Sequence, residues 1–321
     1  MERISSFSAG VKGELARIYP EKACCRLAEL AAIARLDGTV AIEQNDEAGL
    51  YITTEYSAVA RKVYRLFKDL FSIEAALTVK RQNRLKRRTL YHIQTAPSGA
   101  APDLLHTLGI MSANRKIIPG IRKDLVRNKC CRCSYLRGAF LGGGSISSPD
   151  SDYHLELTVG SEKLGKDLMA LTNRFPGLQA KLSQRKQSCL VYLKESDQIA
   201  DFLALMGAHG SLLEFENARV LKGMKNQVNR LVNCETANLD KTVDAAVRQI
   251  NNIRLIEERI GLDALEPSLA QAAMLRLDNP DVNLKELGEI MIPPLGKSGM
   301  NHRLRKIGEI AERLRDDHRP Q

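Results

Sequence analysis

The chain has 321 residues, and 44% of them are hydrophobic, which suffices for folded cores and excludes an intrinsically disordered protein. Its 48 Lys and Arg residues outweigh its 38 Asp and Glu residues. The resulting net charge of +10 favours a polyanionic partner, most commonly a nucleic acid. No segment approaches the roughly 20 apolar residues of a membrane helix, and no cleavable leader is recognisable. We therefore expect a soluble intracellular protein of about two or three domains.

The first two-thirds of the chain contains an internal repeat. Residues 24–26 and 130–132 both read Cys-Cys-Arg, an offset of 106 positions (130 − 24). In each half the predicted order is helix, two strands, helix, two strands, helix. We therefore predict a first domain over residues 1–212, made of two fused, pseudo-symmetric halves at about 22–127 and 128–212.

The opening helix of each half carries a recognisable motif. Residues 30–38 and 136–144 resemble degenerate LAGLIDADG motifs, the helices through which the two halves of a homing endonuclease pack together. Small residues suit such a seam because they let two helix backbones approach closely. The resemblance implies an α+β fold of two LAGLIDADG-like αββαββα halves, followed here by an all-α helix-turn-helix domain.

The catalytic pair of that nuclease family is incomplete in this sequence. In those nucleases, the acid before the final glycine of each helix holds a metal ion beside the scissile phosphate. The corresponding residues here are Asp37 and Gly143, so one carboxylate is missing. Cleavage with two metal ions needs carboxylates to hold both ions. We predict no catalytic residue and interpret Asp37 as part of the turn after its helix. The alternative is an active nuclease or maturase, which would require an acid at position 143.

Seven cysteines, an odd number, do not form the pattern of a secreted disulfide protein. Cys130 and Cys133 have the spacing of a zinc-binding pair, and Cys24 and Cys25 are candidates for the other ligands. Adjacent cysteines on a helix, however, point about 100° apart, and the two pairs lack standard ligand spacing. Buried thiols at a close-packed seam explain them equally well. We predict no metal and no cofactor, while a redox role of the cysteines stays open.

Residues 213–262 are predicted to form a helical linker. Asn238 has the character of a helix cap, and the apolar stripe after it indicates one long helix that ends at Gly261. Two basic segments are secondary candidates for contacts with the DNA backbone. They are Lys225, Asn226 and Arg230 in the linker, and Arg81, Arg84 and Arg87 in a turn between two strands of the first half. The alternative for both segments is an ordinary solvated surface.

The last segment, residues 263–321, has the pattern of a helix-turn-helix over about 283–314. Asn283 and Glu286 form a predicted capping box at the first helix, and two consecutive prolines then end that helix. In the second helix, apolar residues recur at steps of three and four and predict the buried face. They are Met300, Leu304, Ile307, Ala311 and Leu314.

Burial of that stripe turns the basic residues of the second helix outward. The candidate DNA-binding residues are Lys297, Ser298, Asn301, His302, Arg303, Arg305 and Lys306. We expect Arg305 to read a base edge, and Lys297, Arg303 and Lys306 to lie where phosphates would run. The alternative is a helical hairpin with a solvated basic face.

Taken together, these features resemble the WhiA family of bacterial DNA-binding proteins, most closely at residues 138–141, at 226–238 and in the C-terminal helices. The resemblance implies a cytoplasmic, nucleoid-associated, non-enzymatic regulator that binds double-stranded DNA. It implies roles in cell division, chromosome segregation and, in some lineages, sporulation-linked transcription. Another transcription or cell-division protein is a further candidate partner, and no small-molecule substrate is evident. A third hypothesis is a structural cell-division protein whose DNA binding is incidental.

Overall fold

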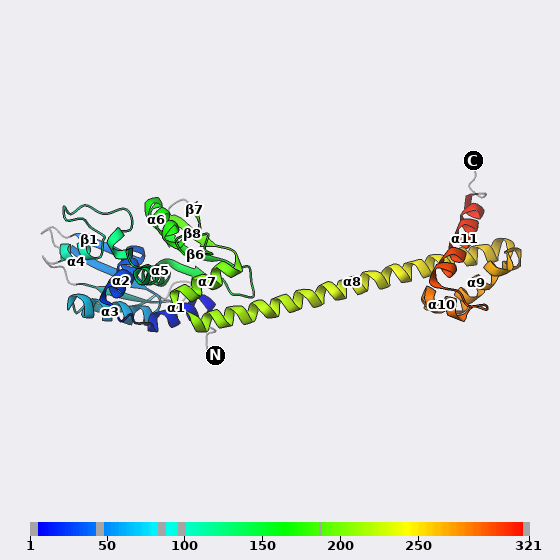
Figure 1. Ribbon diagram of the computed structural model, residues 1–321, viewed down its shortest axis with the longest axis horizontal. Helices are drawn as coiled ribbons and strands as arrows, with labels where there is room; N and C mark the ends of the chain where they lie inside the picture. Colours follow the sequence, from blue (N-terminus) through cyan, green and yellow to red (C-terminus); the bar gives the residue numbers. More distant parts are fainter. Residues whose placement is uncertain (1–5, 43–47, 83–87, 96–100, 186–187, 317–321) are drawn as a thin grey trace. The chain divides into compact units, whose positions relative to one another are not determined.

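The computed structural model describes residues 6–42, 48–82, 88–95, 101–185 and 188–316 (Figure 1). The chain divides into two compact units, Met1–Lys222 and Gly223–Gln321, and each is described by itself. None of the helices in the described part is long and apolar enough to cross a membrane.

The first unit contains two halves with the same order of elements. After α1 (Phe7–Arg17), the first half runs through α2 (Ala23–Asp37), β1 (Gly38–Ile42), β2 (Ala48–Thr54), α3 (Ser57–Phe71), β3 (Ala76–Gln82), β4 (Arg88–Gln94) and α4 (Ala101–Thr107). The second half follows a short 3-10 helix (Lys123–Val126). It runs through α5 (Lys129–Gly143), β5 (Gly144–Ile146), β6 (Leu155–Val159), α6 (Glu162–Thr172), β7 (Lys181–Arg185), β8 (Ser188–Leu193) and α7 (Ser196–Met206). The predicted αββαββα order is confirmed in both halves.

Each half contributes one four-stranded antiparallel sheet. The strand order is β1-β2-β4-β3 in the first sheet and β5-β6-β8-β7 in the second. Corresponding strands of the two halves therefore occupy corresponding places in their sheets. Ile52 pairs with Ile93 in the first sheet, and Leu157 pairs with Val191 in the second. All four side chains are buried, because residues directly opposite each other on paired strands face the same side of the sheet. The repeat in the sequence is therefore a repeat of the fold.

Helices α2 and α5 pack against each other along the seam between the halves (Figure 1). A Cβ atom added at Gly138 would lie 2.3 Å from the backbone oxygen of Glu29 and 2.9 Å from the Cβ of Ala32. Only glycine allows the two backbones to approach this closely. The small residues of the two motifs thus serve the helix contact that the resemblance implied.

A buried ionic cluster lies in the same seam. Glu29 is fully buried and accepts hydrogen bonds from Nε and Nη2 of Arg137, both at 3.0 Å. Lys62 of α3 forms an ion pair with Glu29 and donates to the backbone oxygen of Leu15 at 3.0 Å. Burial lowers the pKa of Lys62, although Glu29 opposes that shift. One carboxylate thus compensates two buried cations that belong to different helices.

Helix α8 (His209–Ile260) is a single helix of 52 residues. The expected helix start at Asn238 is therefore wrong. The backbone oxygen of Asn238 accepts a hydrogen bond from the hydroxyl of Thr242 at 2.9 Å, within the helix. The predicted end is confirmed, because Gly261 has a φ of +76°, a conformation that favours glycine.

The second unit continues with a 3-10 turn (Leu262–Ala264), α9 (Pro267–Asp278), α10 (Leu284–Ile290) and α11 (Lys297–Asp316). Asn283 caps α10, since its side chain accepts hydrogen bonds from the amides of Lys285 at 3.0 Å and Glu286 at 3.1 Å. The predicted apolar stripe of α11 faces the core, where Met300, Leu304, Ile307 and Ala311 are buried. Ile253 and Ile256 of α8 belong to the same core and are fully buried.

Candidate DNA-binding surface

The outer face of α11 is solvent-exposed and basic. Its exposed residues include Lys297, Ser298, Asn301, His302, Arg305 and Lys306, which we call the α11 face. The buried stripe fixes which side of the helix meets solvent, because residues three or four positions apart share one side. Nε of Arg305 also lies 3.6 Å from Oε1 of Glu309 in an ion pair. Both side chains are exposed, so the guanidinium of Arg305 remains accessible.

Arg303 does not lie with the other cations. It is half-buried, and its Nη1 donates to the backbone oxygen of Ser268 at 3.2 Å and contacts Sδ of Met291 at 3.5 Å. This side chain therefore joins α11 to α9, rather than lying at the helix edge where phosphates were expected. The inward position of Arg303 could have been predicted from the sequence, because Arg303 is three residues after the buried Met300 and so lies on the same side of the helix.

A basic cavity of about 440 Å³ lies beside the N-terminal end of α11. Lys241, Lys285 and Lys297 line it, and no acidic residue does. Arg276 forms part of the wall and is almost completely buried, with Nη1 donating to the backbone oxygen of Val282 at 2.7 Å. Burial lowers the pKa of Arg276. Positive charge thus extends from the α11 face toward α8 and α10.

The linker candidates lie on the exposed part of α8. Lys225, Asn226 and Arg230 are all exposed, and so are the apolar residues Met224 and Val228 beside them. A surface of cations mixed with exposed apolar groups suits a nucleic acid or a protein partner equally. The geometry therefore makes these residues available and does not assign them.

The hairpin candidates are only partly described. Arg81 is exposed near the end of β3 and pairs with Thr89 of β4. Arg84 and Arg87 lie outside the described residues. At the corresponding place in the second half, Arg185 is exposed and lies 3.9 Å from Glu156.

A lysine of this protein lies near Asp37, the acid that corresponds to one of the nuclease carboxylates. Asp37 is the last residue of α2, and burial raises its pKa to about 7 although Lys12 opposes the shift. Lys12 of α1 is buried, and its Nζ donates to the backbone oxygen of Gly142 at 3.5 Å. Its pKa is lowered by burial, against the influence of Asp37 and Glu55. A protein ammonium group thus sits near the only acid of the pair.

Position 143 has no room for the missing acid. A Cβ atom on Gly143 would lie 2.5 Å from the backbone oxygen of Thr158 and 2.8 Å from Cδ2 of Leu36. Backbone cannot yield at so short a distance without moving β6 or α5. An acid at position 143, which the alternative of an active nuclease requires, therefore does not fit this backbone.

Asp37 should make the first unit less stable as the pH rises from about 4 to about 7. Its pKa of about 7 in the folded protein lies above the ordinary value of 3.8, so the folded state binds more protons within that window and stability falls with pH. Asp37→Asn should remove this part of the decline. Urea unfolding of the wild type and of Asp37→Asn at about pH 5 and about pH 8 measures the decline in the free energy of unfolding. An identical decline in the two proteins would contradict the prediction.

Two fused LAGLIDADG-like halves followed by a helix-turn-helix domain define the class of this protein. Three family models match it. They are the WhiA N-terminal LAGLIDADG-like domain over residues 23–111, the WhiA LAGLIDADG-like domain over 132–225, and the WhiA C-terminal HTH domain over 228–311.

The chain belongs to the WhiA family. It is 51% identical over 309 residues to the probable cell division protein WhiA of Desulforudis audaxviator, covering 96% of this chain and 97% of that protein. It is 52% identical to the probable cell division protein WhiA of Desulfitobacterium hafniense (strain Y51), covering 97% of each chain. The crystal structure of full-length DUF199/WhiA from Thermatoga maritima is similar, with 25% identity, a TM-score of 0.58, and coverage of 96% of this chain and 99% of that one.

Proposed function

We propose that this protein is a sequence-specific, double-stranded-DNA-binding regulator of bacterial cell division that does not cleave DNA. The observation that carries the proposal is the exposed basic α11 face, held in place by a buried apolar stripe. A helix with cations near its N-terminal half is suited to the major groove. Its relatives are named probable cell division proteins, which supports the cellular role. Chromosome segregation, transcription regulation and sporulation are further proposed roles at the nucleoid in the cytoplasm.

Within this proposal the side chains of α11 divide into three roles. Ser298, His302 and Arg305 read base edges, and Lys297 and Lys306 hold phosphates on either side. Asn301 lies on the same exposed face and contributes a further polar contact. Arg303 positions α11 against α9 through Ser268 and has no direct DNA role.

The cations of the other segments supply affinity without sequence preference. Lys225, Asn226 and Arg230 on α8 and the hairpin cation Arg81 are exposed, which suits contacts with phosphates. The proposed organisation is a scaffold domain over residues 1–212, a helical linker over 213–262 and a DNA reader over 263–321.

Binding selection from random double-stranded DNA tests the sequence-specific role. The full-length protein should enrich one motif, and a Ser298→Ala/His302→Ala/Arg305→Ala variant should bind without enriching it. Arg313→Ala is the matched control, because Arg313 is exposed on the same helix far from its N-terminal end. Enrichment of the same motif by the triple variant would contradict the assignment of α11 as the reader.

The protein is expected not to cleave DNA with Mg²⁺ or Mn²⁺. Gly143 leaves one of the two carboxylates missing, and Lys12 already lies near Asp37. Incubation of the purified protein with plasmid, followed by electrophoresis, measures nicking and linearisation. Cleavage that disappears in Asp37→Ala would overturn this prediction. Cleavage that persists in Asp37→Ala would come from a contaminating nuclease.

A second candidate function is the docking of another transcription or cell-division protein on α8. The observation that favours it is the set of large apolar side chains that α8 exposes in the second unit. They are Met224, Val228, Leu231, Val232, Leu239, Val243 and Val247. Exposed apolar patches of this kind are typical of interaction surfaces.

A further inference from the structure

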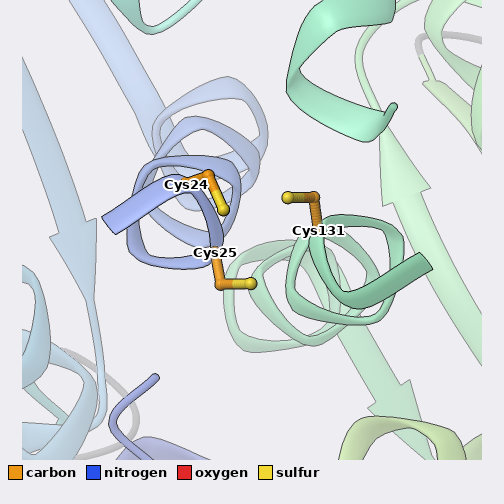
Figure 2. Close-up of side chains that lie close together, drawn as sticks. All are labelled: Cys24, Cys25 and Cys131. Atoms are coloured by element: carbon orange, nitrogen blue, oxygen red, sulfur yellow. The ribbon is translucent and has the colours of Figure 1, made fainter. Parts of the chain in front are cut away.

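Four cysteines lie at one end of the seam between α2 and α5. Cys24 and Cys25 are the second and third residues of α2, and Cys130 and Cys131 occupy the same places in α5. The sulfur atoms of Cys24, Cys25 and Cys131 all lie within 4.8 Å of one another. Figure 2 shows the three side chains converging from two helices on the space between them.

The fourth cysteine completes a symmetrical set. The neighbouring thiol of Cys25 lowers the pKa of Cys130, and burial together with the neighbouring Cys24 raises the pKa of Cys131, so each of these pairs lies close together. Each pair therefore joins a cysteine of α2 to a cysteine of α5. The internal repeat relates the pair Cys25 and Cys130 to the pair Cys24 and Cys131. The spacing in the sequence indicated Cys130 and Cys133, with Cys24 and Cys25, as candidate ligands. The packing of the two helices instead brings Cys131 beside Cys24 and Cys25.

We propose that Cys24, Cys25, Cys130 and Cys131 bind one thiophilic divalent cation, ordinarily Zn²⁺, in a four-thiolate site that joins the two halves. Tetrahedral zinc with Zn–S bonds of about 2.3 Å places its sulfur atoms about 3.8 Å apart. The sulfur atoms of Cys24, Cys25 and Cys131 need to contract by about 1 Å at most, which side-chain rotation provides, and the exposed Cys130 joins them by a larger rotation of its side chain. Binding releases the four thiol protons to solvent and leaves a site with two net negative charges.

The surroundings favour such a site. All four ligands are in the first turns of their helices, where unpaired backbone amides and the helix dipole favour thiolates, whereas burial raises the pKa of Cys25 to about 11 and that of Cys131 to about 12. Lys22 lies close enough to act on Cys130 electrostatically and offsets part of the negative charge. Cys25 and Cys131 are buried, whereas Cys24 and Cys130 are exposed, so an ion can enter from solvent.

This site is separate from the vestigial nuclease position. Cys25 and Asp37 are twelve residues apart on α2 (37 − 25), which corresponds to about 18 Å along a helix. The bound ion therefore has a structural role, holding together the ends of α2 and α5 that lie away from Asp37 and Gly143.

Metal binding by the full-length protein, freed of metal by a chelator under reducing conditions, tests the proposal. Zn²⁺ in competition with a chromophoric chelator should bind with one ion per chain. Co²⁺ should produce the thiolate-to-metal charge-transfer band and the strong visible absorption of tetrahedral thiolate coordination. Cys24→Ser should weaken Zn²⁺ binding by roughly 100-fold or more, since losing even a group that only supports a ligand costs 10–100-fold. Cys234→Ser, at an exposed cysteine outside the cluster, is the matched control and should bind like the wild type.

The cobalt spectrum of the wild-type protein decides the matter even if a variant fails to fold. Absence of the charge-transfer band, or a stoichiometry well below one ion per chain, would overturn the proposal. Zn²⁺ affinities of folded Cys24→Ser and Cys130→Ser equal to that of the wild type would overturn it too. So would a disulfide between these cysteines in protein isolated without oxygen. Because neither measurement involves DNA, the result is independent of the proposed function.

Discussion

Replacing Glu29 with alanine should lower the free energy of unfolding of the first unit by about 3–5 kcal/mol. Glu29 is fully buried and is paired with Arg137 and Lys62, which are themselves buried. The variant would leave two desolvated cations without their carboxylate, and that penalty exceeds the loss of any single contact. The seam between the halves would lose its central link, because the three residues come from α2, α5 and α3.

Urea unfolding followed by tyrosine fluorescence measures the effect in the first unit alone. All eight tyrosines lie within residues 1–222, and the chain has no tryptophan. Glu162→Ala is the matched control. Glu162 pairs with Lys166 in solvent, so its loss should cost less than about 1 kcal/mol. A loss for Glu29→Ala as small as that of the control would show that the buried cluster contributes little to stability.

Arg305→Ala should weaken binding to the preferred DNA by about 1–3 kcal/mol, a loss of roughly 5- to 150-fold, and relax the preference at one base pair. The guanidinium of Arg305 is exposed on the α11 face and can donate two parallel hydrogen bonds to guanine. Lys306→Ala should instead weaken binding to every sequence to a similar degree, because a phosphate contact carries no base identity.

Affinities of both variants for the preferred DNA and for an unrelated duplex, at one fixed salt concentration, separate the two effects. The specificity ratio should fall for Arg305→Ala and stay constant for Lys306→Ala. Arg313→Ala, an exposed arginine near the other end of α11, should change neither affinity. Equal loss on both duplexes for Arg305→Ala would mean that Arg305 contacts a phosphate.

The repeat and the helix-turn-helix were predictable because their signals are local. Corresponding motifs and apolar spacing such as that of Met300 and Leu304 can be read within a few turns of helix. The start of α8 was missed because Asn238 is compatible with a cap but also with a helix interior. No glycine or proline separates it from the preceding turns strongly enough to end a helix.

Contacts between side chains far apart in the sequence could not be predicted. Arg303 and Ser268 are 35 positions apart, and Arg137 and Glu29 are 108 apart. Their contacts depend on the packing of whole helices, so periodicity on one helix cannot reveal them. For the cysteine cluster, the sequence placed Cys24, Cys25 and Cys130 together as candidate ligands, but it indicated Cys133 where the packing of the helices brings Cys131.

The two isoleucines that α8 contributes to the core of the second unit limit how this helix-turn-helix domain can be transferred between proteins. Ile253 and Ile256 are fully buried there, and truncating a buried isoleucine to alanine typically costs about 2–5 kcal/mol. A fragment that begins at residue 263 would lack both side chains and should not fold by itself. Natural recombination or deliberate grafting would preserve the fold of this domain only if the junction fell upstream, in the exposed turns near Val243, where the cut severs no core contact.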